Sequence, residues 1–315
     1  MDFAETLEHL SKADSPFRPA AVYSLSNLET AEVEQLVAIW PAIPVTRRYA
    51  LVKELVEVAE ANFEVDFEPI FRWGLQDSDA AVRATCVEGL WESEDLALMN
   101  RLLQMLKTDP SDLVRAAAAL SLGRFVLLGE LGKLTSERCR PVYDALYCII
   151  QEGRDSLEVC RRALESIAYV SNDDVLTLIQ DAYDHPDDKM RISAVFGMGR
   201  SADARWVGAV MGELFSVDPE MRYEAARACG ELQAGEAVSR LADLVDDPDR
   251  EVQEAALWAL GQTGGDEARQ LLEHCYRQGD EVVRSAAEAA LQELEFLHGQ
   301  LDFPLYSFDD IQPDQ

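Results

Sequence analysis

The sequence predicts an all-α protein, an α-solenoid of about eight helical hairpins. One short motif recurs seven times in the 315 residues, and its last five copies are each 31 residues apart. Equal spacing of this kind is the sequence signature of a repeat architecture, in which each unit packs on its neighbours. Hydrophobic residues make up 48% of the chain, which is enough apolar material for a folded core.

Each copy of the motif opens on an apolar residue, here called the anchor, which Arg often follows. A small residue comes four positions after the anchor, and an apolar residue comes eight positions after it. These spacings place the three residues on one face of a helix, where the small one lets a neighbouring helix approach closely. The anchors are Val82, Val114, Val159, Met190, Met221, Val252 and Val283.

The segments around each anchor predict a hairpin of two helices. An acidic turn such as 246–249 precedes the anchor, and Asp and Pro suit the first turn of a helix. A second helix is expected after the anchor helix, beginning for example at Asp203 or Asp266. Glycine follows several motifs and is expected to stop the anchor helix; these residues are Gly123, Gly199, Gly230 and Gly261.

This pattern resembles the HEAT-repeat family over residues 40–297, and the 31-residue period is similar to that of its phycobilisome-lyase-like branch. The resemblance implies that the anchor helices line the concave inner surface of the solenoid. That branch includes bilin lyases and metal-dependent hydroxylases, so the resemblance implies a fold and several different functions.

The array is expected to have three parts. Residues 1–40 are predicted to form N-terminal capping helices, 41–297 the repeat array and 298–315 a C-terminal tail. A helix around Arg47 is interpreted as a degenerate first unit. Pro304 ends helix propagation in the tail. The tail then caps the last repeat, fills the groove or is disordered, and the sequence leaves these three alternatives open.

One spacing is irregular, because 45 residues separate Val114 from Val159. The surplus is assigned to an insertion near 126–137, where Gly129 and Gly132 are expected to break the helix. Insertions in repeat proteins often carry contacts specific to one family, although a plain surface loop is the alternative.

Charge and composition exclude several classes of protein. The net charge of −31 argues against binding to duplex nucleic acid, which needs Lys and Arg to neutralise phosphates. No apolar run is long enough to span a bilayer, and residues 1–5 lack the features of a signal peptide. We therefore expect a cytoplasmic protein that binds neither duplex nucleic acid nor membranes; its oligomeric state stays open.

No constellation in the sequence predicts an enzyme. The six cysteines form no C-x-x-C pair and are expected to be reduced thiols that fill gaps in the core. None of the four His precedes a Glu, whereas the resemblance implies His-Glu pairs as iron ligands in hydroxylases. Phosphate-binding and nucleophile-elbow motifs are also absent from the sequence. We expect no cofactor, no metal ligands and no catalytic residues.

The predicted inner face carries a candidate binding groove. If the anchor helices line that face, the residues two, three, six and ten positions after each anchor point outward. In the middle of the array these positions combine arginine with aromatic residues, a composition typical of interface anchors. The candidate partner-binding residues are Arg161, Arg162, Tyr169, Phe196, Arg200, Tyr223, Arg227 and Trp258. For each aromatic residue, packing between helices is the alternative.

The arginines one position after the anchor are interpreted differently. We expect them to pair with Asp residues of adjacent turns in a structural ladder, so they are excluded from the groove. They are Arg83, Arg115, Arg191, Arg222 and Arg284.

These features favour a non-enzymatic scaffold or adaptor whose groove binds an acidic or extended polypeptide. The first alternative is a bilin-lyase-like chaperone that presents a chromophore to an acceptor protein. The second is a metal-dependent hydroxylase on the same fold, which the absence of His-Glu pairs disfavours.

Overall fold

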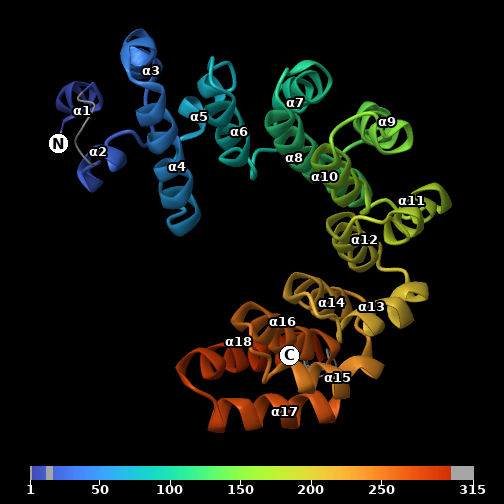
Figure 1. Ribbon diagram of the computed structural model, residues 1–315. Helices are drawn as coiled ribbons and strands as arrows, with labels where there is room; N and C mark the ends of the chain where they lie inside the picture. Colours follow the sequence, from blue (N-terminus) through green and yellow to red (C-terminus); the bar gives the residue numbers. More distant parts are fainter. Residues whose placement is uncertain (1, 12–16, 299–315) are drawn as a thin grey trace, which may run out of the picture. The chain divides into compact units, whose positions relative to one another are not determined.

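The computed structural model describes residues 2–11 and 17–298, and its regular elements in that part are all helices (Figure 1). The chain divides into two compact units, Met1–Gly197 and Met198–Gln315, and the division falls within helix α12 (Asp188–Arg200). The predicted all-α fold is therefore confirmed. The predicted tail from residue 299 onward lies outside the described residues.

The first unit is a series of helical hairpins that follows a small N-terminal group of helices. The helix that begins near each anchor, here called the anchor helix, packs on the next one: α4 on α6, α6 on α8, and α8 on α10. The second helices α7 and α9 cover one side of this layer. The helices are α1 (Phe3–Leu10), α2 (Pro19–Tyr23), α3 (Thr30–Ile39), η1 (Trp40–Ala42), α4 (Val45–Ala61), α5 (Glu68–Gly74), α6 (Ala80–Glu88), α7 (Leu96–Thr108), α8 (Asp112–Glu130), α9 (Ser136–Glu152), α10 (Leu157–Ile167) and α11 (Asp173–Tyr183).

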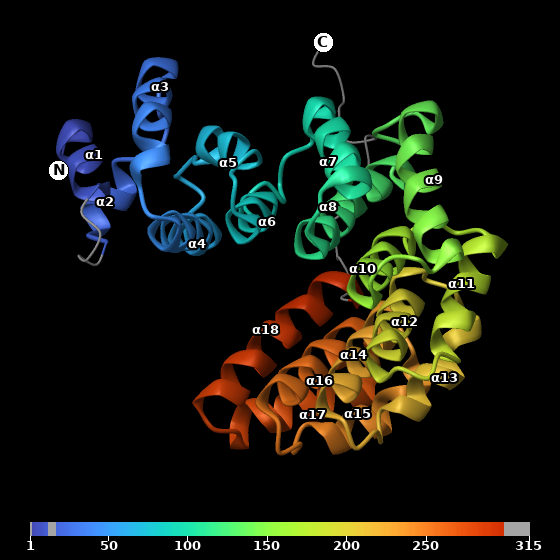
Figure 2. The ribbon, with the colours of Figure 1, turned by 45° about the horizontal axis from the view of Figure 1, so that its top comes forward.

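The second unit repeats the same arrangement with greater regularity. Its anchor helices α14, α16 and α18 lie side by side, and α13, α15 and α17 pack against them (Figure 2). The helices are η2 (Ala204–Trp206), α13 (Val207–Glu213), α14 (Pro219–Glu231), η3 (Gly235–Ala237), α15 (Val238–Leu244), α16 (Arg250–Thr263), α17 (Gly265–Gln278) and α18 (Glu281–His298).

The motif explains why these helices stack. Val252, Ala256 and Leu260, at the anchor and at four and eight positions after it, are completely buried on one face of α16. Asp249 caps the same helix, since its carboxylate accepts hydrogen bonds from the amides of Glu251 and Val252. The apolar face and the acidic turn thus define one helix and its packing.

The predicted arginine ladder is confirmed for Arg83, Arg115 and Arg222, each of which pairs with an Asp of the next turn. Arg222 contacts both carboxylate oxygens of Asp247, at 2.7 and 2.9 Å, and also donates to the carbonyl of Ser216. Arg83 makes the same two-point contact with Asp109, at 2.9 and 2.7 Å. Each pair joins an anchor helix to the turn before the next anchor helix, so the ladder runs between repeats.

The other rungs differ in detail. Arg115 pairs with Asp112 of its own turn and with Asp155 of the next turn. Arg191 pairs with Asp188 of its own turn, and Arg284 donates to the carbonyl of Gly279 instead of to an Asp. In the degenerate first unit, Arg48 takes the ladder position and donates to Asp77 at 3.0 Å.

The neighbouring Arg47 is also buried, and it joins α1 to the first unit. Its guanidinium donates to the carbonyls of Leu10 and His9, at 2.8 and 3.0 Å. These are the last carbonyls of α1, which have no acceptor role inside their own helix. Arg47 thus caps the end of α1 and holds it against α4.

We expected the glycines that follow the motif to end the anchor helices, and this prediction is wrong. Gly230 lies inside α14 and is buried, and a Cβ on it would lie 2.5 Å from the ring of Trp258 on α16. Gly261 approaches the backbone of Ala290 in the same way, and Gly123 approaches Ser166. The missing side chain therefore serves close packing between successive anchor helices.

The expected insertion lengthens two helices instead of forming a loop. α8 has 19 residues and α9 has 17, against 11 in α10. Gly129 lies within α8, where a Cβ would meet Sγ of Cys139 at 2.6 Å, so the prediction that it breaks the helix is wrong. Gly132 does lie outside the helix, with φ of +70°. The surplus residues thus form a taller hairpin.

The cysteines agree only in part with the expected role. All six are free thiols, and Cys86, Cys160, Cys229 and Cys275 are buried. Cys139 is half-buried and Cys148 is exposed, so the prediction of core packing is wrong for Cys148.

Candidate functional site

Two of the hollows lined by described residues lie on the anchor helices, one in each unit. The first-unit hollow has a volume of about 450 Å³ and is lined by α6, α8, α10 and the turns that follow α6 and α10. The second-unit hollow has a volume of about 950 Å³ and is lined by α14, α16 and α18. Both therefore lie on the helices that carry the repeated motif.

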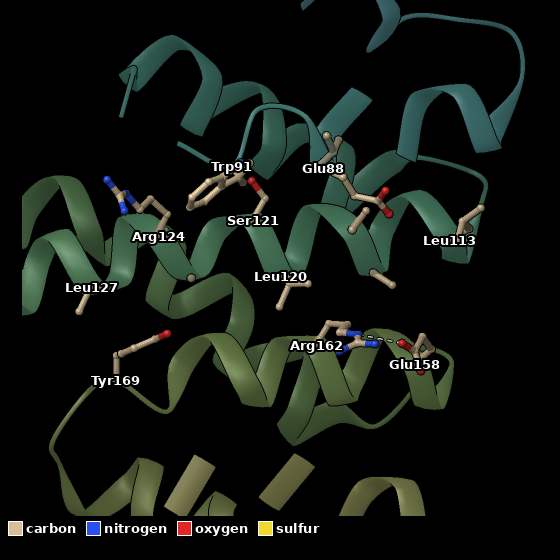
Figure 3. Close-up of a pocket in the computed structure, with 14 residues that line it drawn as sticks. Glu88, Trp91, Leu113, Leu120, Ser121, Arg124, Leu127, Glu158, Arg162 and Tyr169 are labelled. Carbon is tan, nitrogen blue, oxygen red and sulfur yellow. Dashed lines mark hydrogen bonds and ion pairs between the residues drawn. The ribbon is translucent and has the colours of Figure 1, made fainter. Parts of the chain in front are cut away.

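An apolar stripe dominates the first-unit hollow. Leu113, Leu120 and Leu127 are seven residues apart on α8, so they lie on one face of the helix. Figure 3 shows Leu120 and Leu127 directed toward the side on which Arg162 and Tyr169 lie. Leu113 is 53% exposed and Leu120 is 46% exposed, and Trp91 beyond α6 is 50% exposed. The stripe is thus open to solvent at Leu113 and Leu120, whereas Leu127 is half-buried.

The charged groups around the first-unit hollow balance one another. Arg124 forms an ion pair with Glu94 at 2.6 Å, and Arg162 pairs with both Glu158 and Glu165 at 2.8 Å. Burial raises the pKa of Glu88, and the charge of Glu60 raises it further. The rim therefore presents no excess of positive charge.

Arg161 does not face the groove, and its expected position there is wrong. Its side chain is 6% exposed, and its Nε donates to Oγ of Ser193 on α12 at 2.9 Å. Ser193 in turn donates to Glu165 at 2.6 Å, and Arg161 also pairs with Glu158. The reason is that the Arg161 side chain reaches the next anchor helix, α12, and is covered there.

Of three more predicted groove residues, one lines a hollow and two do not. Tyr169 lines the first-unit hollow. Phe196 and Arg200 are half-buried on α12, outside both hollows. Arg200 forms an ion pair with Glu231 at 3.0 Å; burial raises the pKa of Glu231, although Arg200 and Arg227 lower it in part.

The structure brings Tyr223, Arg227 and Trp258 together in the second-unit hollow. The guanidinium of Arg227 lies over the Trp258 ring, 3.7 Å from its centroid. Glutamates from the three anchor helices surround this group. They are Glu220, Glu224, Glu251, Glu254 and Glu293.

The sequence reasoning missed the residue that precedes each anchor. Leu113, Glu158, Glu220 and Glu251 occupy that position, and all four line a hollow. A residue one position before the anchor shares a helical face with those three and six positions after it, so helical spacing alone contained the signal. Because this position was left out of the predicted groove, the sequence analysis did not predict that the second-unit hollow is acidic.

The arginines consequently do not form a free cationic groove. Arg161, Arg162 and Arg200 pair with glutamates of this chain, and Arg227 is surrounded by glutamates. A carboxylate from a partner would have to displace these internal pairs. The expected preference for an acidic polypeptide therefore has no support in the charges of either hollow.

Two further properties bear on the chemistry of these surfaces. Within residues 2–11 and 17–298, no group of three or more His, Cys, Asp or Glu side chains is arranged to hold a metal ion. No helix among those residues has the length and apolar character that crossing a membrane requires.

Comparisons with known proteins agree with this architecture. The HEAT-repeat family model matches residues 68–135 and 209–292. No curated protein matches the sequence. The complex of CpcE and CpcF of phycocyanin lyase from Nostoc sp. PCC7120 is a similar solved structure, with 15% identity and a TM-score of 0.56, covering 90% of this chain and 97% of that one.

Two other solved structures are less similar in geometry. The protein YibA of Escherichia coli has 17% identity and a TM-score of 0.46, and the match covers 90% of this chain and 98% of that one. Importin beta has 14% identity and a TM-score of 0.45, and the match covers 93% of this chain and 46% of that one. The matched family segments and the stacked hairpins agree with each other: residues 68–135 and 209–292 are HEAT repeats.

Proposed function

We propose that this HEAT-repeat solenoid is a scaffold that holds an extended polypeptide segment of another protein in the first-unit hollow. The leucine stripe of α8 carries the proposal, because Leu113 and Leu120 are about half exposed beside the similarly exposed Trp91. A row of large apolar side chains in a hollow is typical of an interaction site. Covering it removes apolar surface from water, which favours binding.

The dimensions of the stripe indicate the size of the segment. Leu113 to Leu127 spans fourteen residues of helix, or about 21 Å. An extended chain advances ~3.3 Å per residue, so about six residues would follow the stripe. Since the rim charges are paired, we expect apolar side chains of the segment to supply most of the affinity.

A comparison of the partners captured by the unaltered protein and by the Leu120→Glu variant tests this proposal. The tagged full-length protein and the variant are incubated with extract of the native host, and bound proteins are identified by mass spectrometry. Phe63→Glu is the matched control, since Phe63 is 82% exposed in the first unit but outside the hollow. We expect Leu120→Glu to weaken capture of a specific partner at least about tenfold, as burial of a leucine contributes ~1.5–3 kcal/mol.

The control variant should retain that partner. Equal loss in both variants would indicate a general effect of added charge. Undiminished capture by Leu120→Glu would remove the first-unit hollow from consideration.

A bilin-lyase-like chaperone is the second candidate. The apolar hollow suits a conjugated chromophore, and the phycocyanin lyase complex shares the fold. Carboxylates of the chromophore would have to displace the internal pairs of Arg124 and Arg162. Titration of the protein with a linear tetrapyrrole tests it by absorbance. A saturable spectral shift that Leu120→Glu removes would favour this candidate, and an unchanged spectrum would eliminate it.

A further inference from the structure

We propose that the second-unit hollow is a docking site for an extended basic polypeptide segment. This site goes beyond the proposed function, because it is a separate surface with a different charge. The described residues that line it all come from α14, α16 and α18.

The charge of the hollow favours a cationic occupant. Five glutamates line it and Arg227 is its one basic lining residue, whereas the first-unit hollow is lined by two glutamates and two arginines. Glu220, Glu251 and Glu293 form no ion pair within the described part of the chain. These carboxylates are thus available to a partner, and Lys or Arg side chains complement them.

Aromatic side chains add a second recognition element. Trp258 already holds a guanidinium on its face, that of Arg227 at 3.7 Å, and Tyr223 lies in the same hollow. Gly230 fixes this arrangement, because the Trp258 ring occupies the space of the missing Cβ. Because Arg227 occupies the Trp258 face, Tyr223 is the ring that a guanidinium or ammonium group of the partner would contact, and this attraction grows when water is excluded. The hollow therefore suits side chains that bring both a charge and an aliphatic stem.

The shape of the hollow indicates an extended segment. Neighbouring helices pack ~8–10 Å apart, so the path from α14 to α18 is about 16–20 Å. Five or six residues of extended chain cover that distance, with alternate side chains directed at the floor. Ala255, Ala286 and Ala289 line the hollow between the larger groups and leave it open.

The chain's own C-terminal sequence has the wrong charge for this site. Residues 301–315 contain four Asp and neither Lys nor Arg. Like charges at close range oppose binding, so the occupant is expected to come from another protein.

Fluorescence anisotropy with synthetic peptides tests the proposal on the full-length protein. The probe is a labelled ten-residue peptide of alternating Arg and Ala, and a Glu-Ala peptide of equal length is its counterpart. The groove variant combines Glu220→Gln, Glu251→Gln and Glu293→Gln. The control variant combines Glu236→Gln, Asp243→Asn and Glu288→Gln, which removes three exposed charges of the second unit outside the hollow.

The Arg-Ala peptide should bind saturably with one-to-one stoichiometry, and the Glu-Ala peptide should not bind. We expect the groove variant to bind about tenfold more weakly, since exposed ion pairs contribute ~0.2–1 kcal/mol each. The control variant should stay within about twofold of the unaltered protein. Tyr223→Ala should also weaken binding, which a purely electrostatic attraction to an acidic protein would not explain.

Equal weakening in the two triple variants would overturn the proposal, because it would show binding to the overall negative charge. Binding of the Glu-Ala peptide with similar affinity would also overturn it. Absence of saturable binding at low salt, with circular dichroism showing folded protein, would do the same.

Discussion

Ser193 on α12 lies 2.6 Å from Oε1 of Glu165 on α10, and its hydroxyl also accepts a hydrogen bond from Arg161 at 2.9 Å. The serine thus completes a buried network in which an arginine and a glutamate from one helix reach the next helix. Arg162, one residue along the chain, reaches the same glutamate from a more exposed position.

Replacement of these two arginines should have different effects on stability. Arg161→Met leaves Ser193 and Glu165 short of a buried partner, so we expect a loss of about 2–4 kcal/mol in the free energy of unfolding. Arg162→Met removes a partly exposed pair and should cost about 1 kcal/mol or less. Urea titration followed by circular dichroism measures both. Equal losses would contradict the assignment of Arg161 to the interior.

Acid should weaken the arginine ladder. The hydrogen bond from Arg222 holds the pKa of Asp247 below its usual value; burial opposes the pKa shift of Asp109, but Arg83 lowers that pKa overall. A carboxylate whose pKa is lower in the folded state stabilises the protein above its unfolded pKa, near 4. That stability is lost as the pH falls through the folded pKa.

We therefore expect Asp247→Asn to reduce stability at pH 7 and to flatten its decline below about pH 4. Urea midpoints measured between pH 7 and pH 2.5 show the slope. Asp243→Asn, at an exposed position of the same unit, is the control and should keep the slope of the unaltered protein. If Asp247→Asn leaves the slope unchanged, the Arg222–Asp247 pair does not contribute to the pH dependence of stability.

Two glycine substitutions should change the stability of the protein in opposite directions. Gly230→Ala places a methyl group 2.5 Å from the Trp258 ring, so it should destabilise the protein by about 1–3 kcal/mol. Gly212→Ala, in α13, has no neighbouring atom within 4 Å and should stabilise it by about 0.5–1 kcal/mol, the usual gain within a helix. Thermal midpoints distinguish the two. Stabilisation by both would mean that the Trp258 ring moves freely.

Thiol reactivity should follow burial. Cys148 is exposed and should react first with a thiol reagent, although a hydrogen bond to Glu152 raises its pKa. Burial raises the pKa of Cys229 to about 12, so it should react only on unfolding, together with the other buried cysteines. Counting reacted thiols with and without urea, in the unaltered protein and in Cys148→Ser, checks the order. A rapid thiol that persists in Cys148→Ser would contradict it.

The sequence predicted the repeats more completely than it predicted the surface. The anchor, Ala256 and Leu260 define the buried face of α16, and Asp249 its start, so the hairpins follow from local spacing. The spacing does not specify from which side the next anchor helix approaches. That approach buried Arg161 at the second position, which was predicted to face the groove.

The sequence also left the length of α8 undetermined. A glycine such as Gly129 ends a helix in one setting and admits a neighbouring side chain in another. In this protein Gly129 admits a neighbouring side chain, because Cys139 on α9 packs against it. The end of α8 therefore depends on its packing against α9, which the sequence of α8 alone does not specify.

The arginine ladder has a consequence for how such a chain can grow. Some units offer a cation at one side and a carboxylate at the other, as Arg83 with Asp109 and Arg222 with Asp247 show. Duplication of such a unit as a whole supplies a new donor together with a new acceptor, and every existing pair is kept. Gain or loss of complete repeats is thus compatible with the fold. A partial duplication would instead separate an arginine from its aspartate and leave one charge unpaired.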